Sequence, residues 1–420
     1  MTGPPSLEGA WVDVLNSAYF KTVPWNREPR QARLGSVDAL RCCAMTAVVA
    51  QHCGLFPYGW MGVWLFFVIS GFVVTGSALE GAREVAPGRR FGAFMSRRAR
   101  RIIPVYYAYV LVGAVVVVLS GNRLDPVAFT SLLGFFSNTA MAVGRGEFVG
   151  WPVGHLWTIS IEMQFYLVFG LVLVYASERV AKIIFVAALF AAPLLRLAAS
   201  DALTRFGWSI DPAYAIYSGS LLHSDSFAAG ALLAFAMRDG KLRPFARPLA
   251  LMGAMSLLCY VLFYVGVNGM DGATGIDQLR NVISGVLWGQ YRQVFVYSVL
   301  AAACAGLVAM AACRDPLLEW LLGRPLLQRI GYVSYGAYVF HSLVIFVVLA
   351  ALESLLSITP GEHSLGTRLL TLAIAYPVTL VAAEMSFRFF ESKFLVRTTT
   401  SSVVPLPAPF EGQVGISRRG

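Results

Sequence analysis

Charged residues are scarce in this chain of 420 residues, of which only 13% are Asp, Glu, Lys or Arg. Ordinary soluble domains carry roughly 25%. Hydrophobic residues make up 57% of the sequence, and they gather in runs long enough to cross about 30 Å of hydrocarbon. This composition excludes an ordinary soluble protein and predicts an all-α, polytopic integral membrane protein.

Cysteine is also sparse, and the six cysteines have no spacing typical of a metal site or a disulfide framework. At least four of them fall inside the predicted spans, where cysteine behaves as a small apolar residue. We therefore expect no metal cofactor and no disulfide-stabilised fold. Residues 1–35 are polar and mixed, so we expect a cytoplasmic segment there and no cleavable signal peptide.

Basic residues are in excess, giving a net charge of +10, but they lie in short loops beside the predicted spans. Membrane topology and lipid headgroups explain such loops, so we expect membrane lipids and no nucleic acid as partners. With both termini in the cytoplasm, 25 of the 33 Lys and Arg residues lie on the cytoplasmic side, as the positive-inside rule requires.

About ten transmembrane helices are predicted from the apolar runs. They cover residues 36–54, 61–79, 102–120, 155–175, 183–199, 219–237, 248–267, 292–312, 332–352 and 366–387. Another apolar piece, 127–143, would invert every later loop if it crossed, so we expect a partial or surface-lying helix in an outer loop. One transmembrane domain, 36–395, thus follows the N-terminal segment 1–35 and precedes a tail, 396–420, predicted to be disordered and cytoplasmic.

Two polar side chains inside the first predicted span are the most informative feature of the sequence. Arg41 and His52 are eleven residues apart, so an α-helix places them on one face, within about 20° of each other and roughly 16 Å apart in depth. Polar and ionisable groups inside a membrane are costly and mark functional sites by default. The helix therefore presents a fixed cation and a titratable imidazole to one interior path.

An arginine cluster follows the second predicted span and includes Arg97, Arg98 and Arg101. Arg98 and Arg101 are one helical turn apart, so both guanidinium groups can face one anion. Arginine matches phosphate geometry better than lysine, and the loop 80–101 contains seven arginines and no lysine. The alternative is that the cluster only sets topology and binds lipid headgroups.

The fourth predicted span opens with His155 and Trp157 and carries Glu162 one to two turns further in. His155 and Glu162 are seven residues apart, which places them on one helix face about 10 Å apart in depth. We expect His52, His155 and Glu162 to converge in the outer half of the membrane, where such groups suit acid–base chemistry. A buried, hydrogen-bonded helix contact is the alternative for each residue.

Asp225 starts a later span and could line the same outer cavity, although an acidic residue at a helix start is commonly a cap. Tyr338 and His341 form part of a polar stripe on the ninth span, for which hydrogen bonding between helices is the commoner explanation. Two ion pairs are also predicted from spacing, Asp38 with Arg41 and Glu384 with Arg388.

Together these stretches resemble the membrane acyltransferase 3 family. The matching motifs are in order and at family-like spacing, and they cover residues 37–41 with His52, 62–72, 97–104, 155–166 and 331–341. The resemblance runs from about residue 35 to 395. It departs from the family at Trp64, where relatives have a small or acidic residue, and at Met163, which interrupts an acidic-polar pair.

The resemblance implies transfer of an acyl group, commonly acetyl from acetyl-CoA, to a hydroxyl of a sugar or a small lipophilic acceptor. By matching position, Arg41 and His52 would form the intramembrane pair, Arg98 and Arg101 would hold the CoA phosphates, and Glu162 would belong to the catalytic region. His52 would act as general base or transient acyl carrier. Arg41 would position the donor or stabilise an oxyanion.

The acceptor that this resemblance implies is a cell-surface glycan or a lipid-linked sugar, with a macrolide-like small molecule as the alternative. Trp157, Asp225, Tyr338 and the histidines at 155 and 341 are the candidate acceptor contacts. A transporter or flippase of a glycan or lipid is the rival function, because an intramembrane Arg–His–Glu path could also bind a cargo or relay protons. The expected location is a bacterial inner membrane.

Overall fold

The computed structural model describes residues 34–395, apart from 81–84, 207–209, 280–281, 284, 359–360 and 362. The described part is helical throughout, with one isolated β-bridge between Phe148 and Trp151. The prediction of an all-helical membrane protein is therefore confirmed. The terminal segments expected at 1–35 and 396–420 fall almost entirely outside the described residues.

Within the described residues, nine helices are long and apolar enough to cross a membrane. They are α3 (Met61–Leu79), α4 (Pro87–Leu119), α7 (Trp157–Tyr175), α8 (Glu178–Phe206), α10 (Ser224–Arg238), α11 (Ala246–Met270), α12 (Arg292–Ala312), α15 (Ser334–Leu356) and α16 (Leu365–Ser386). Short 3₁₀ turns lead into three of them, η1 (Gly154–Leu156) before α7, η2 (Ser220–His223) before α10 and η3 (Arg243–Phe245) before α11. The last helix continues through a π-helical turn, η5 (Phe387–Glu391), into α17 (Ser392–Phe394).

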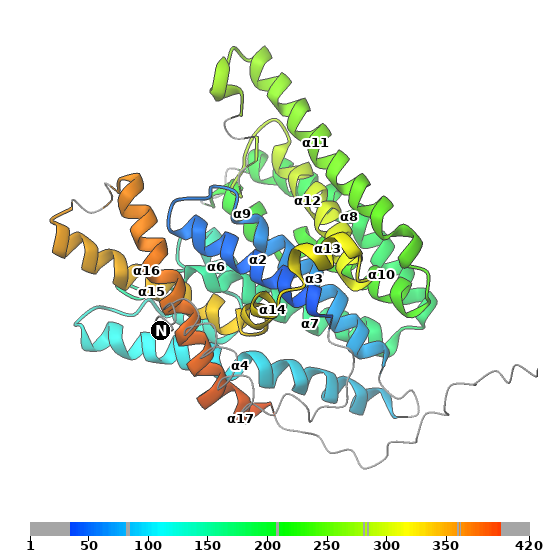
Figure 1. Ribbon diagram of the computed structural model, residues 1–420, viewed down its shortest axis with the longest axis horizontal. Helices are drawn as coiled ribbons and strands as arrows, with labels where there is room; N and C mark the ends of the chain where they lie inside the picture. The colour runs from blue at the N-terminus through cyan, green and yellow to red at the C-terminus, as the bar shows by residue number, and fades with distance from the viewer. Residues whose placement is uncertain are drawn as a thin grey trace, which may run out of the picture.

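The first of the ten expected spans forms the 18-residue helix α2 (Gly35–His52), which is not among the nine. Its ionisable residues Asp38, Arg41 and His52 reduce its mean hydropathy. It lies in the middle of the bundle, against α3, α12, α14 and α15, so protein side chains surround most of it (Figure 1). Its polar groups are therefore tolerated because they face other helices and cavities.

Three short helices begin with the same Asp-Pro pair. These are α5 (Pro126–Leu133), α9 (Pro212–Ser218) and α13 (Pro316–Leu322), and in each the preceding Asp accepts a hydrogen bond from a backbone N–H of the first turn. An aspartate cap followed by proline at the first helical position is a strong helix start. The piece 127–143 thus forms α5 and α6 (Ser137–Ala142), both too short to cross a membrane.

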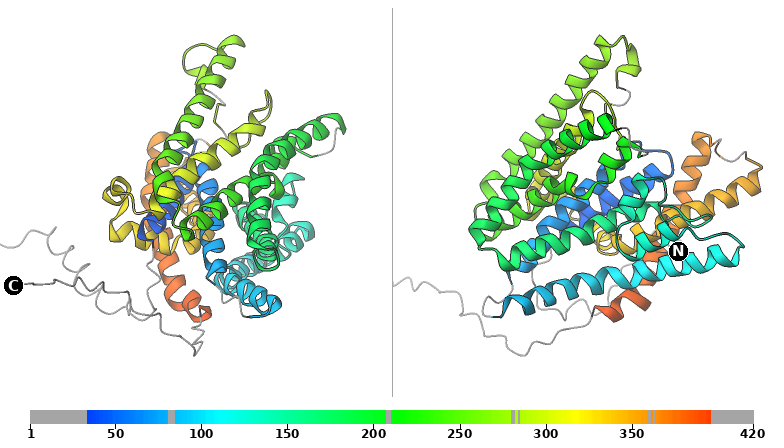
Figure 2. Two further views of the ribbon diagram at one scale, coloured as in Figure 1. Left: turned by 90° about the vertical axis from the view of Figure 1, so that its right-hand side faces the viewer. Right: turned by 180° about the vertical axis from the view of Figure 1, so that it is seen from behind.

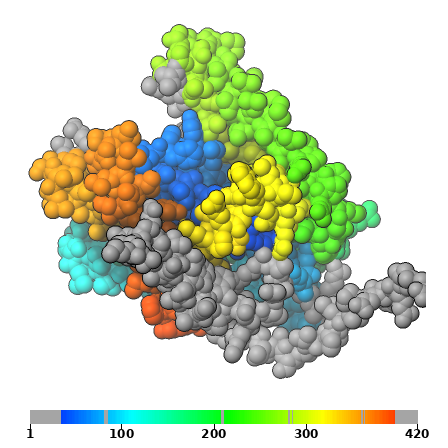
Figure 3. All heavy atoms as spheres, in the orientation of Figure 1, coloured from blue at the N-terminus to red at the C-terminus, as the bar shows by residue number. Residues whose placement is uncertain are grey.

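Helix α4 has 33 residues, which corresponds to a length of about 50 Å. It is longer than the predicted span because its N-terminal half carries the arginines, whereas the apolar half begins near Pro104. Figure 2 shows α4 along one edge of the bundle. On another face, α13 and α14 (Pro325–Tyr332), drawn in yellow in Figure 3, lie against α2.

Close backbone contacts hold α3 at the centre. A Cβ atom at Gly71 would lie 2.1 Å from the carbonyl oxygen of Phe227 on α10, and one at Gly230 would lie 2.0 Å from that of Val68. Small residues permit such an approach between membrane helices. The α3–α10 pair therefore forms a rigid support for the side chains that α3 presents to the site.

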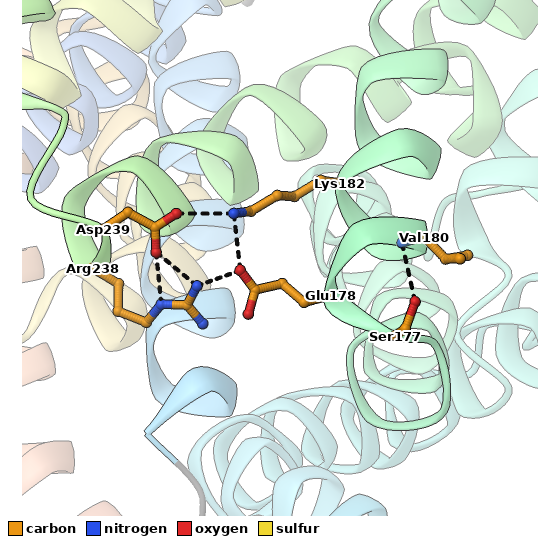
Figure 4. Close-up of polar contacts among 6 residues, drawn as sticks. All are labelled: Ser177, Glu178, Val180, Lys182, Arg238 and Asp239. Carbon is orange, nitrogen blue, oxygen red and sulfur yellow. Dashed lines mark hydrogen bonds and ion pairs between the residues drawn. The ribbon is translucent and has the colours of Figure 1, made fainter.

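Segments that the topology prediction puts on one side meet at one end of the bundle. Glu178 of α8 forms an ion pair with Arg238, the last residue of α10, at 2.5 Å, and Lys182 of α8 forms one with Asp239, which follows it, at 2.9 Å (Figure 4). The two cations hold the pKa of Asp239 below its usual range. At the other end, Arg368 donates to the carbonyl oxygen of Gly54. The helix order is thus consistent with the expected crossings, while the identity of the cytoplasmic end stays a prediction.

Candidate functional site

One cavity lies among α2, α3, α4, α7 and α15 and contains three arginines, so we call it the arginine cavity. Its volume is about 90 Å³. Its polar lining residues are Arg41, Ser70, Arg98, Arg101, Thr158, Glu162, Tyr166, Ser334, Tyr335 and Tyr338. The remaining wall is apolar and includes Val63, Phe66 and Ile102. Three cations beside one small cavity make it suited to an anionic ligand.

The arginines differ in what already holds them. Arg41 Nη1 lies 2.8 Å from Asp38 Oδ1, which confirms the predicted ion pair and fixes the side chain. Arg98 contacts only the hydroxyl of Ser77, at 3.4 Å, and its buried Nε has no hydrogen-bond partner among the described residues. No ion pair with a described carboxylate is formed by Arg98 or Arg101. A buried hydrogen-bond donor without a partner is typical of a site that binds a ligand.

Glu162 lies in this same cavity, where it accepts hydrogen bonds from the hydroxyl groups of Ser70 and Tyr166. It does not line the cavity that contains His52 and His155, although the sequence predicted that these three residues would converge. The reason is depth, because seven residues of helix carry Glu162 about 10 Å further along α7 than His155. Its contacts place it beside the arginines instead.

A second cavity, of about 920 Å³, contains the histidines and is called the histidine cavity here. It lies at the other end of α2 and is lined in part by the loop before α7 and by α9. Its polar and aromatic lining residues are Gln51, His52, Trp60, Glu147, His155, Trp157, Asp211, Tyr214, Tyr217, Tyr338, Ser342 and Phe346. Apolar residues of α2 and α15, such as Val48 and Ile345, complete one wall.

Two histidines, His52 and His155, line this cavity, and a third, His341, is fully buried beside them. The ring centroid of His341 lies 4.9 Å from those of both His52 and His155, in edge-to-face arrangements. His155 Nε2 is 3.0 Å from the carbonyl oxygen of Val339, and His341 Nδ1 donates to that of Tyr338 at 2.6 Å. His52 is exposed to the cavity and makes no hydrogen bond to a described residue. His52 is therefore the histidine with its ring nitrogens open to a ligand.

The two cavities share two wall residues, Val63 of α3 and Tyr338 of α15. The hydroxyl group of Tyr338 accepts a hydrogen bond from Thr158 at 2.8 Å and donates one to the carbonyl oxygen of His155 at 3.0 Å. The junction is thus held by contacts between α7 and α15. Arg41 and His52 lie on opposite sides of it along one helix.

Three candidate residues line neither cavity: Arg97, Asp225 and His341, the last of which is fully buried. Arg97 is exposed on α4 and lines neither cavity. Asp225 is 2% exposed and pairs with Arg196 at 2.9 Å, away from both cavities. Arg196 is fully buried and also donates to Ser298 and to the carbonyl oxygen of Val294. Their roles in ligand binding stay predictions, and Asp225 has a clear structural role.

Several lining residues were not singled out from the sequence, and four of them carry a carboxylate or bind Glu162 directly: Ser70, Tyr166, Glu147 and Asp211. Ser70 and Tyr166 fall inside stretches that matched the family motifs, so their polarity within apolar helices was an available signal. Glu147 and Asp211 lie in connecting segments, where no helical periodicity indicates the direction of a side chain. Their place in the cavity depends on how α6, η1 and α9 pack.

Comparison with known proteins shows the family of this chain. A family model described as an acyltransferase domain matches residues 34–383. The peptidoglycan O-acetyltransferase OatA of Listeria monocytogenes is 27% identical over 386 residues, covering 85% of this chain and 55% of its own length. A protein of Staphylococcus aureus strain COL, named "Putative O-acetyltransferase", is 24% identical over 389 residues, which are 89% of this chain and 59% of that protein.

A third relative is named "Putative membrane-bound transacylase BcsY" and comes from Komagataeibacter xylinus. It is 29% identical over 223 residues, or 51% of this chain and 52% of its own length. The chain therefore spans little more than half the length of these curated relatives. No solved structure is significantly similar to this chain.

Proposed function

Since this chain belongs to the acyltransferase family whose model covers residues 34–383, we propose that it moves an acyl group from acyl-CoA to a hydroxyl group of a glycan. The donor that we propose is acetyl-CoA. The observation that carries the proposal is the pair of cavities, one lined by arginines and one by histidines, that meet at Val63 and Tyr338.

The arginine cavity is the proposed donor site. The phosphates of CoA are anionic, and Arg98 and Arg101 form no ion pair with a described residue that a phosphate would have to displace. The partnerless Nε of Arg98 adds a donor that a phosphate oxygen would satisfy. Arg41, already fixed by Asp38, lines the same cavity and is the proposed group that orients the donor.

The histidine cavity is the proposed site of acyl transfer. His52 takes the proton of the acceptor hydroxyl, whose oxygen attacks the thioester carbonyl carbon. The C–S bond breaks, a C–O bond forms, and the proton passes from His52 to the CoA thiolate. In a two-step route, the His52 ring nitrogen attacks the thioester carbonyl carbon, the C–S bond breaks, and the CoA thiolate leaves with the proton that the imidazole ring gives up. The acceptor oxygen then attacks the acyl carbon, the N–C bond breaks, and the hydroxyl proton passes to His52. Both routes need the thioester to reach the junction from the arginine cavity.

The acceptor is proposed to be a sugar of the cell surface. The curated relative from Listeria is named for O-acetylation of peptidoglycan, and the histidine cavity combines aromatic rings with hydrogen-bonding groups. Its volume of about 920 Å³ is adequate for one or more sugar rings. The expected location is a bacterial inner membrane, with the arginine cavity toward the cytoplasm.

Release of CoA from acetyl-CoA by the purified protein, with and without glycan acceptors, tests the proposal. We expect acceptor-stimulated release from the wild type and a loss of at least about 100-fold in His52→Ala, as for removal of a general base. Binding of acetyl-CoA should persist in this variant. His363→Ala, which removes a histidine paired with Glu353 outside both cavities, is the matched control. Absence of both release and CoA binding in the wild type would refute the proposal and favour a transporter.

A further inference from the structure

The two cavities differ in the sign of the charge on their walls. Among the described residues, the arginine cavity has three arginines and one carboxylate, Glu162. The histidine cavity has two carboxylates, Glu147 and Asp211, and neither lysine nor arginine. Since the focused field in a cleft selects ligands by charge, the two cavities favour ligands of different charge.

Glu147 is held in the loop between α6 and η1. Its Oε2 accepts a hydrogen bond from the backbone N–H of Gly154 at 3.2 Å, and its side chain is open to the cavity. The protein packed around it raises the pKa of its carboxyl group, because removal of water disfavours the charged form. A second anion in this space would add repulsion to that cost.

Asp211 is fixed by its position at the start of α9. Its Oδ1 accepts hydrogen bonds from the backbone N–H groups of Ala213 and Tyr214, at 2.9 and 3.1 Å. The neighbouring cation, Arg145, does not offset either carboxylate, because it forms a two-pronged pair with Asp125 at 2.6 and 3.0 Å. The field of Glu147 and Asp211 therefore acts on whatever occupies the cavity.

The cavity also has the other groups that a sugar needs. Trp157 and Tyr214 supply aromatic surface, on which the apolar face of a sugar ring can stack. At the wall, Trp60 Nε1 and His155 Nδ1 are buried and have no hydrogen-bond partner among the described residues. Partnerless polar atoms beside a large cavity indicate a ligand with hydroxyl groups.

We propose that the acceptor is a neutral or cationic sugar, and that Glu147 and Asp211 exclude sugars with a carboxylate or phosphate near the reacting hydroxyl. This inference rests on the proposed function for the identity of the reaction. The charge selectivity itself is a property of the cavity and can be measured without turnover.

Alkylation of His52 by two reagents of equal shape, iodoacetamide and iodoacetate, measures that selectivity. In each case the unprotonated ring nitrogen displaces iodide from the reagent carbon, and the other ring nitrogen then gives up its proton to solvent. The rate at His52 is followed by peptide mass spectrometry on the full-length protein. We expect the neutral reagent to react faster than the anionic one after correction for their intrinsic rates, by roughly twofold to tenfold for one to two unit charges nearby.

The variants Glu147→Gln and Asp211→Asn remove the charges and keep the shapes. Asparagine also caps helices as well as aspartate does, so α9 is retained. In the double variant, the ratio of the two rates should approach the intrinsic ratio, whereas Asp201→Asn, which alters an exposed carboxylate paired with Arg205, should leave it unchanged. Equal or faster reaction with iodoacetate in the wild type, or no reaction at His52, would overturn the inference.

A turnover experiment separates this inference from the proposed function. Cellotriose and a chitosan trimer serve as neutral and cationic acceptors, and trigalacturonate as the anionic one. Faster acetylation of the neutral or cationic sugars supports the inference. Preferential acetylation of trigalacturonate would overturn it and leave the acyltransferase proposal intact, whereas absence of CoA binding would refute the latter without changing the alkylation result.

Discussion

Arg98→Ala tests the donor site because Arg98 makes few polar contacts within the protein. Its guanidinium group has one long hydrogen bond, to Ser77 at 3.4 Å, and no ion pair with a described residue. Removal should therefore cost little stability and mainly remove contacts with the ligand. One charge-assisted hydrogen bond contributes about 1.5–3 kcal/mol. The dissociation constant for acetyl-CoA should thus rise about 10- to 100-fold, and further in the double variant with Arg101→Ala.

The assay is calorimetric titration of acetyl-CoA into the protein in lipid nanodiscs, at two salt concentrations. Arg238→Ala is the matched control, since Arg238 lies at the same end of the bundle but is committed to Glu178 and Asp239. Arg98→Lys should recover part of the affinity, because lysine keeps the charge but loses the forked geometry. Unchanged affinity in folded Arg98→Ala, or equal weakening in Arg238→Ala, would refute the assignment of this cavity to CoA.

Three further predictions concern the junction, the buried ion pair and the acidic wall. Val63→Phe should block acyl transfer while changing acetyl-CoA binding by less than about threefold, because it adds bulk at the junction at an overpacking cost of about 1–3 kcal/mol; loss of binding together with transfer would contradict this. Asp225→Ala should destabilise the protein by about 3–5 kcal/mol, because it leaves Arg196 buried without a counterion; an unchanged melting temperature in detergent would refute the structural role. Glu147→Gln should raise the melting temperature above the wild type at pH 8, because a carboxyl with a raised folded pKa is destabilising when ionised. The difference should disappear as pH falls through that pKa and the wild-type carboxyl takes up its proton; a constant difference would contradict the assignment.

The long helices were predictable because hydrocarbon demands continuous apolar sequence. The span expected at 292–312 coincides with α12 (Arg292–Ala312). Departures occur where protein, not lipid, surrounds the chain. Helix α2 is less apolar than a typical membrane span, which is tolerated because other helices surround it. Helix α4 extends beyond its apolar run because its arginine-rich half does not need to contact hydrocarbon.

The relative positions of candidate site residues were predictable where those residues lie on one helix. Arg41 and His52 both lie on α2 and line the two cavities that share Val63 and Tyr338, because helical periodicity fixes their direction and depth. Contacts between helices were harder to predict from the sequence. The approach of His341 to His52 depends on how α15 crosses α2, and Glu162 belongs with the arginines because depth along α7 outweighs its shared face with His155. No local pattern could have assigned Glu147 to the cavity.

Tyr338 shows why the two halves of the proposed reaction are difficult to separate. Its backbone carbonyl accepts from His341 Nδ1, its hydroxyl group binds Thr158 and the carbonyl of His155, and its ring lines both cavities. A movement of Tyr338 that widens the junction therefore also disturbs two of the three histidines. On the proposed function, an anionic donor is drawn to the arginines, the acidic wall repels it from the other side, and Tyr338 lies where the thioester must pass. On that proposal, charge would direct each substrate to its own cavity, and the acyl group would reach His52 through the junction.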